Sequence, residues 1–181
     1  SFSNLDEQTD GLLIHSENFQ ALELLQERYR QQVKCIYADP PYNTSASEIA
    51  YKNNYKHSSW MSLLDSRVAL SREMLTAEGI ACYTIDDFEF DRLRQLLALR
   101  FGEDRLLGIT PIRNNPSGRS TAKGFSIAHE YALYFARTES ASVGRLERTD
   151  EQAARYDEAD EKGHFEWVNF RKHGGTRAES P

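Results

Sequence analysis

Four consecutive residues, Asp39-Pro40-Pro41-Tyr42, combine groups that could bind and activate a planar amino group. Each proline favours an extended conformation in the residue before it, so we expect Asp39 and Pro40 in a stiff, extended turn. The Asp39 carboxylate and the Pro40 carbonyl oxygen would then be two neighbouring acceptors for the two hydrogens of one amine. Tyr42 offers a flat face on which a base could stack, a contact worth about 1–3 kcal/mol. A plain turn followed by a core tyrosine is the alternative.

The chemistry that this arrangement suits is attack by a ring amine on an electrophile. Such an amine is a poor nucleophile because its lone pair is delocalised into the ring. Acceptors for both N–H bonds favour the geometry and the charge that develop as the nitrogen attacks, which adds electrostatic stabilisation to positioning. The tetrapeptide is therefore typical of group transfer to an aromatic amine.

The tetrapeptide follows a predicted strand in a chain that alternates strand-like and helix-like segments up to about residue 137. Strands are expected at the apolar runs 11–15, 34–38, 80–85, 106–112 and 131–136. Helices are expected where apolar residues recur at helical spacing, at 18–30, 59–77 and 88–101, with Gly79 and Gly102 as stop signals. This alternation predicts an α/β fold with a mostly parallel sheet flanked by helices. Ligands of such sheets bind beyond the carboxyl ends of the strands, where the tetrapeptide lies.

The stretch KCIYADPPYNTS resembles motif IV of amino-methyltransferases, the (D/N/S)PPY motif. Further blocks follow in the order found in the beta class of adenine-N6 DNA methyltransferases, particularly the modification subunits of type III restriction systems. These blocks are KHSSWMSLLDSRVALSREMLTAEGIACYTIDDFEFDRLRQLLALRFGED, KGFSIAHEYALYFAR and FRKHGGTRAESP. The resemblance implies a partial Rossmann-like methyltransferase fold, S-adenosylmethionine as cofactor and DNA as substrate.

By this resemblance, the catalytic motif Asp39, Pro40, Pro41 and Tyr42 holds a base extruded from the duplex, which otherwise hides the amino group. Asp39 would also lie beside the cofactor. Aspartate at the first position of the motif favours adenine, whereas serine is typical of cytosine-N4 enzymes. The resemblance also implies a restriction subunit as a partner, and enzymes of this kind often form dimers.

Candidates outside the motif each have a structural alternative. The segment 15–18 resembles an element near the cofactor adenine, which makes Glu17 a candidate cofactor contact or a helix cap. His129 could line the base pocket or serve the fold. Asp86 and Asp87 could be a cofactor-side acid pair or cap a helix. The candidate substrate contacts are Tyr42, Asn43, His129, Arg119 and Lys123.

The beta class carries a glycine-rich cofactor loop after its target-recognition region, yet none of the ten glycines here belongs to a Gly-x-Gly sequence. We therefore expect residues 1–137 to be the catalytic part of a methyltransferase domain. Residues 138–181 are expected to begin a truncated target-recognition or linker region. Such a fragment is expected to bind the cofactor weakly and to be inactive alone.

Composition limits the remaining classes. The net charge of −6 weighs against binding nucleic acid by bulk charge, although residues 105–129 carry four Lys and Arg and no acidic residue. No apolar run approaches the length of about 18 residues that suggests a membrane span. Cys35 and Cys82 lie in apolar strand-like runs and are expected to be buried, reduced thiols of a cytoplasmic protein, with no metal site.

Two other functions fit the same residues. The tetrapeptide type also serves RNA, cytosine N4 and other amino acceptors, because all of them present a planar amino group. A non-catalytic nucleic-acid-binding module that lacks the cofactor loop is the other alternative.

Overall fold

The computed structural model describes residues 9–44, 55–114, 125–147, 149–150, 154, 158–165 and 167. The chain divides into two compact units, Ser1–Val143 and Gly144–Pro181. The first unit holds a four-stranded sheet and its helices, and the second holds a small hairpin.

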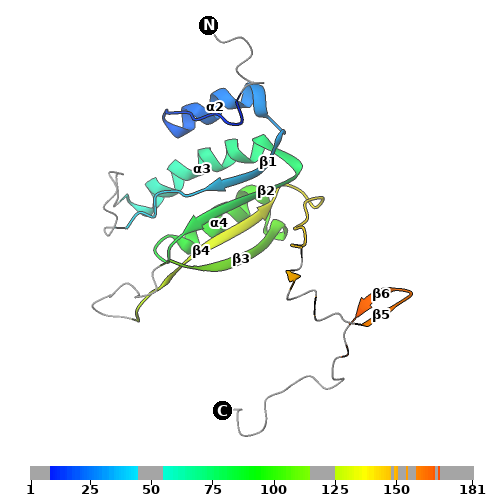
Figure 1. Ribbon diagram of the computed structural model, residues 1–181. Helices are drawn as coiled ribbons and strands as arrows, with labels where there is room; N and C mark the ends of the chain where they lie inside the picture. The colour runs from blue at the N-terminus through cyan, green and yellow to red at the C-terminus, as the bar shows by residue number, and fades with distance from the viewer. Residues whose placement is uncertain are drawn as a thin grey trace. The chain divides into compact units, whose positions relative to one another are not determined.

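The sheet of the first unit is mixed. Its strands are β1 (Val33–Ala38), β2 (Leu75–Ile85), β3 (Leu106–Arg113) and β4 (His129–Ala136), in the order β1-β2-β4-β3 (Figure 1). Only the β1–β2 pair is parallel, whereas β4 runs antiparallel to both β2 and β3. The expectation of a mostly parallel sheet is therefore wrong. β3 and β4 are consecutive and have no crossover helix between them in the described chain, so they pair as antiparallel neighbours.

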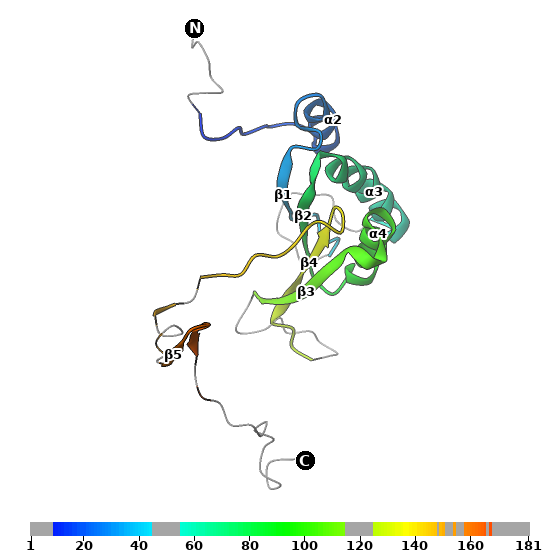
Figure 2. The same ribbon diagram turned by 90° about the vertical axis from the view of Figure 1, so that its right-hand side faces the viewer.

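The helices are α2 (Asn18–Tyr29), α3 (His57–Met74) and α4 (Phe90–Phe101), followed by a 3₁₀ turn η1 (Glu103–Arg105). α3 and α4 cover the same face of the sheet (Figure 2). α2 lies against α3, where the Gln26 side-chain amide donates to the Leu70 carbonyl oxygen at 2.9 Å. α4 ends at Gly102 as predicted, and the φ of +109° at this position favours glycine.

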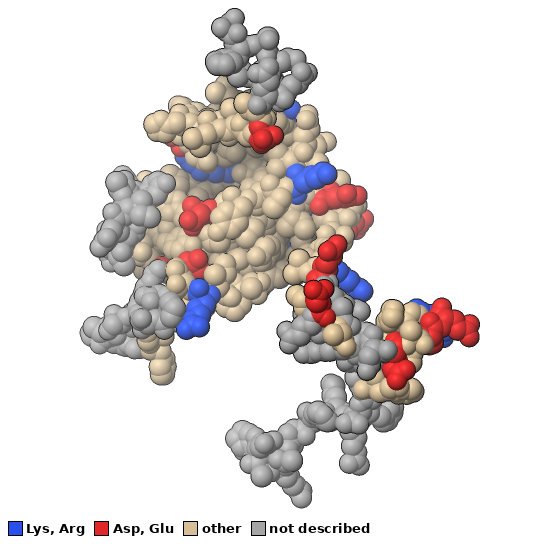
Figure 3. Space-filling model, in the orientation of Figure 1, with Lys and Arg blue, Asp and Glu red and all other residues tan. Residues whose placement is uncertain are grey.

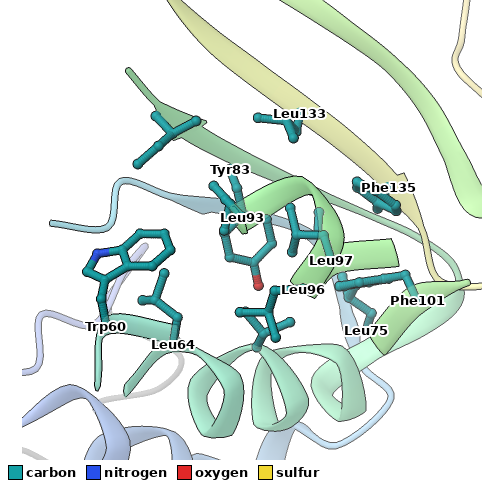
Figure 4. Packing of buried hydrophobic residues seen from close by; sticks show 13 residues of the cluster. Trp60, Leu64, Leu75, Tyr83, Leu93, Leu96, Leu97, Phe101, Leu133 and Phe135 are labelled. Carbon is teal, nitrogen blue, oxygen red and sulfur yellow. The ribbon is translucent and has the colours of Figure 1, made fainter. Parts of the chain in front are cut away.

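The core lies between these two helices and the sheet (Figure 4). Its buried members are Trp60, Leu64, Val68, Leu75, Ala81, Tyr83, Ile85, Leu93, Leu96, Leu97, Phe101, Leu133 and Phe135. Leu93, Leu96 and Leu97 recur at helical spacing on α4 and are at most 3% exposed. Each fully buried leucine contributes about 1.5–3 kcal/mol through the hydrophobic effect.

Two expected elements differ from the observed ones. The run 11–15 is not a strand: Leu12 and Leu13 are 69% and 96% exposed, because no strand of the described chain lies beside it to complete a ladder. α3 ends at Met74, before Gly79, and β2 begins at Leu75. Gly79 lies inside β2, where a Cβ would meet the Leu75 side chain at 2.9 Å, so its lack of a side chain permits this close approach.

The two cysteines have different environments. Cys82 is buried, and burial raises the pKa of its thiol. Cys35 is exposed on β1, so the expectation that it is buried is wrong. β1 is the first strand of the sheet order and pairs only with β2 there, which leaves its outward side chains uncovered. Within the described ranges, no helix is long and apolar enough to cross a membrane.

The second unit contains an antiparallel hairpin of β5 (Glu158–Asp160) and β6 (Gly163–Phe165). Its turn is stabilised where the Lys162 backbone N–H donates to Asp160 Oδ1 at 2.8 Å. The boundary after Val143 lies a few residues beyond the predicted edge at 138. That this part begins a target-recognition region stays a prediction.

Candidate active site

Polar residues lie together at one edge of the sheet, where β1 and β2 end and β4 begins. Asp39 directly follows β1, whose last residue, Ala38, pairs with Tyr83 of β2. Because β4 is antiparallel to β2, the start of β4 lies at the same edge, and Tyr131 pairs with Ile85. The tetrapeptide is thus found at the carboxyl end of the parallel pair, as predicted.

The Asp39 carboxylate is exposed and held on one side. Thr84 Oγ1 donates a hydrogen bond to Asp39 Oδ1 at 2.9 Å. Thr84 is only 1% exposed, so its hydroxyl is a fixed donor. Thr84 was not among the site residues predicted from the sequence; a hydroxyl next to the last residue of an apolar strand was the available signal. This bond restrains the rotamer of the carboxylate that the motif presents.

The Tyr42 ring is half-buried, and its hydroxyl is tied to the start of β4. The hydroxyl donates to Glu130 Oε2 at 3.3 Å, and Asn114 Nδ2 donates to the same oxygen at 2.8 Å. Burial, together with the Asp39 and Glu130 carboxylates, raises the pKa of Tyr42 well above its usual value. The phenol therefore stays protonated further into the alkaline range than a free tyrosine and remains a donor towards Glu130 there.

The second proline of the motif is anchored to the core. Trp60 Nε1 on α3 donates to the Pro41 carbonyl oxygen at 2.8 Å. Trp60 is fully buried beside Leu64 at one end of the hydrophobic cluster (Figure 4). Sequence periodicity predicted Trp60 only as a core residue, yet its indole also fixes the backbone of the motif.

Asn43, a predicted substrate contact, is 1% exposed. Its Oδ1 accepts from the Tyr55 backbone N–H at 2.7 Å, and its Nδ2 donates to the Tyr55 carbonyl oxygen at 3.0 Å. The structure therefore engages the Asn43 amide with protein backbone instead of presenting it to a ligand.

Residues 33–177 match the family model described as DNA methylase, N6_N4_Mtase. The chain belongs to this DNA methylase family. It is 30% identical to the type II methyltransferase M.KpnI of Klebsiella pneumoniae over 97% of the chain and 43% of that protein. It is 26% identical to the Mod subunit of the type III restriction-modification enzyme EcoPI of Escherichia phage P1, over 94% of the chain and 31% of that protein.

The chain thus spans less than half the length of these relatives. Among solved structures, the PvuII DNA methyltransferase, named as cytosine-N4-specific, matches 67% of the chain and 48% of its own, with a TM-score of 0.51 and 13% identity. This similarity confirms the partial Rossmann-like α/β fold. The resemblance drawn from the sequence motifs is confirmed by the family match.

Glu17 serves the fold. It is the N-cap of α2, where its Oε2 accepts from the Gln20 backbone N–H at 3.1 Å. Its Oε1 pairs with Arg67 on α3. Of the two roles considered for Glu17, the structure contains the helix cap.

The other candidate residues that the structure describes lie around the same edge of the sheet as the tetrapeptide. His129 is exposed, and its Nε2 lies 2.9 Å from the Tyr131 hydroxyl, which donates to Asp87 Oδ1 at 3.1 Å. Its neighbour Glu130, rather than His129, contacts Tyr42. Asp86 is buried and accepts from the Phe88 backbone N–H at 3.0 Å, a turn that leads into α4 and favours the capping alternative. Arg119 and Lys123 lie outside the described residues.

Charge is dispersed on the face shown in Figure 3. The acidic and basic side chains of described residues lie there singly or in small groups, without a continuous basic patch among them. This face therefore gives no indication of DNA binding through bulk positive charge.

Proposed function

We propose that the protein that carries this chain transfers a methyl group from S-adenosylmethionine to the exocyclic N6 of an adenine flipped out of DNA. The observation that carries the proposal is the position of two restrained side chains just after the carboxyl end of β1: the exposed Asp39 carboxylate, held by Thr84, and the half-buried Tyr42 ring, held by Glu130. Membership of the DNA methylase family supports the same reaction.

In this proposal, Asp39 and the Pro40 carbonyl oxygen accept the two N6 hydrogens of the base. The remaining lone pair is then directed at the electrophile, and the carbon–sulfur bond of the methyl donor would break as the carbon–nitrogen bond forms. The carboxylate stabilises the positive charge that develops on the nitrogen until one N6 proton is lost to solvent. Thr84 holds Asp39 in place, since it donates to one carboxylate oxygen. Extrusion of the base is required because the duplex buries the amino group.

Tyr42 supplies the platform for the flipped base. The bond to Glu130 restrains the ring through its hydroxyl, while Trp60 restrains the backbone through Pro41. A ring with both ends restrained offers its face without loss of side-chain entropy when the base stacks.

S-adenosylmethionine, when bound, supplies an electrophilic methyl group on a sulfonium cation. The residues present fit this group by charge, since Asp39 is an exposed negative group just after the carboxyl end of β1. Glu17 fits it less well because its two oxygens already serve Gln20 and Arg67.

DNA is the proposed substrate, and a restriction subunit is a proposed partner. The EcoPI relative is named as the Mod subunit of a type III restriction-modification enzyme, which supports a partner of this kind. A homodimer and a cytoplasmic location stay predictions from the sequence.

The test uses the complete gene product, S-adenosylmethionine and unmethylated genomic DNA, which contains all short recognition sequences. The DNA is digested, and modified nucleosides are identified by mass spectrometry. We expect N6-methyladenine, and its loss in Asp39→Ala with the fold intact by circular dichroism. N4-methylcytosine would keep the chemistry and overturn the choice of base. Methylation of RNA or protein alone would overturn DNA as the acceptor.

A further inference from the structure

A buried carboxylate lies behind the tetrapeptide and is not used by the proposed chemistry. Glu89, the residue before α4, is 0% exposed. Its Oε1 accepts from Asn43 Nδ2 at 2.6 Å and lies 2.7 Å from His57 Nδ1. Its Oε2 accepts from Arg92 Nη1 at 3.2 Å. A carboxylate is retained in such a place only when paired partners compensate its desolvation, and here three segments of the chain supply them.

The partner of greatest consequence is Asn43, which directly follows Tyr42. Its φ is +61°, in the left-handed region that costs non-glycine residues free energy, although asparagine tolerates it best. The direction in which the backbone leaves the tetrapeptide depends on this conformation. Asn43 keeps it while its amide is held by Tyr55 on one side and by Glu89 on the other.

Glu89 also connects the motif to both helices that cover the sheet. His57 is the first residue of α3, and its ring packs against Phe88 with centroids 5.6 Å apart. Trp60, one turn further along α3, donates to the Pro41 carbonyl oxygen. Arg92 lies in the first turn of α4. Movement of Glu89 would therefore remove one of the two described partners that hold the Asn43 amide, leaving only Tyr55, and would loosen the start of α3, from which Trp60 holds the motif.

We propose that Glu89 is a positioning residue of the methyltransferase site, which sets the placement of Asp39–Tyr42 through the left-handed residue Asn43. This inference rests on the proposed function for its kinetic consequence, but its structural consequence is independent of it. Glu89 contacts neither substrate nor cofactor in this role. Its side chain fixes where the motif's acceptors and ring lie.

The main test is Glu89→Gln in the complete gene product, which keeps the side-chain shape and removes the charge. We expect kcat for methylation to fall about tenfold, because the motif is misplaced, with KM for S-adenosylmethionine within about twofold of the original value. Leu97→Val is the matched control, since Leu97 is a buried core residue of the adjoining helix that has no part in the network. It should lower the melting temperature and leave kcat unchanged.

A second substitution separates positioning from mere stability. Glycine adopts positive φ freely, so Asn43→Gly removes the need for Glu89 to hold that conformation. Glu89→Gln lowers kcat by some factor in the original protein. In the Asn43→Gly background, we expect that factor to be at least fivefold smaller. Equal losses of kcat in both backgrounds, or an unchanged kcat in Glu89→Gln alone, would overturn the proposal.

A measurement that does not depend on methylation activity separates this inference from the proposed function. The indole N–H resonance of Trp60, assigned by its loss in Trp60→Phe, reports on the bond to Pro41. We expect Glu89→Gln to shift this resonance and Leu97→Val to leave it in place. If the original protein methylates nothing, the proposed function fails, and a shifted resonance still supports the positioning role. An unmoved resonance in Glu89→Gln overturns it in either case.

Discussion

Thr84 Oγ1 donates to Asp39 Oδ1 across 2.9 Å and joins the end of β2 to the residue that follows β1. The two residues are neighbours only because β1 and β2 pair in parallel, with Ala38 opposite Tyr83. A buried hydroxyl thus restrains an exposed carboxylate at the edge of the sheet. This bond is a means by which the fold orients the first residue of the motif.

Thr84→Val should reduce methylation without unfolding the protein. Valine has nearly the shape of threonine but cannot donate, so a hydrogen bond to a charged group worth about 1.5–3 kcal/mol is lost. We expect a fall of about tenfold in kcat, measured by transfer of a radiolabelled methyl group to DNA. Thr84→Ser keeps the hydroxyl and should retain most of the activity. Equal activity of the Val and Ser variants would show that the bond does not orient Asp39.

Substitutions of Tyr42 should separate its ring from its hydroxyl. Tyr42→Phe keeps the stacking face and loses the bond to Glu130, so we expect only a several-fold loss of activity. Tyr42→Ala removes the face and should weaken retention of the flipped base by about 1–3 kcal/mol. Fluorescence of 2-aminopurine placed at the target position measures this retention. Equal fluorescence in the Phe and Ala variants would contradict a stacking role.

Tyr83 should make stability fall at alkaline pH. Burial raises the pKa of Tyr83 to about 12, whereas an unfolded tyrosine ionises near pH 10. Between these values the native state binds more protons than the unfolded state, so the free energy of unfolding decreases as pH rises. The contribution is complete below about pH 10 and is lost as pH rises towards about 12.

Urea unfolding at several pH values between 8 and 11 measures this effect. Tyr83→Phe lacks the titrating hydroxyl and should show a shallower decline above about pH 10, although Tyr42 still contributes in the same direction. Identical slopes for the two proteins would mean that Tyr83 does not have the raised pKa.

Glu17 should affect stability and leave cofactor affinity unchanged. Glu17→Ala removes the N-cap of α2 and the pairing with Arg67, so we expect the melting temperature to fall by a few degrees. Glu17→Gln retains a capping oxygen, so its melting temperature should fall less than that of Glu17→Ala. Calorimetric titration of the complete gene product with S-adenosylmethionine should give the same Kd for all three proteins. A higher Kd in both variants would mean that Glu17 does contact the cofactor.

Local chemistry made several features predictable from the sequence. The β1 strand and its end at Asp39-Pro40 follow from an apolar run and two prolines. The helical stripe of Trp60, Leu64 and Val68 is buried as its spacing predicts. Periodicity carries no information on strand direction, however, so the antiparallel course of β4 was not foreseen. For the same reason, a strand was expected at 11–15 without regard to whether another strand lies beside it.

The sequence alone indicated the type of chemistry that we propose, because Asp39, Pro40, Pro41 and Tyr42 are adjacent and their geometry is largely local. It also determined the family, since the motifs that follow stand in a fixed order. Only the tertiary structure decided which residues support that motif. Thr84, Glu130 and Glu89 lie 45, 88 and 46 residues away from their partners Asp39, Tyr42 and Asn43. Such contacts depend on strand pairing and helix packing, which bring distant segments together and which residue types and spacing do not encode locally.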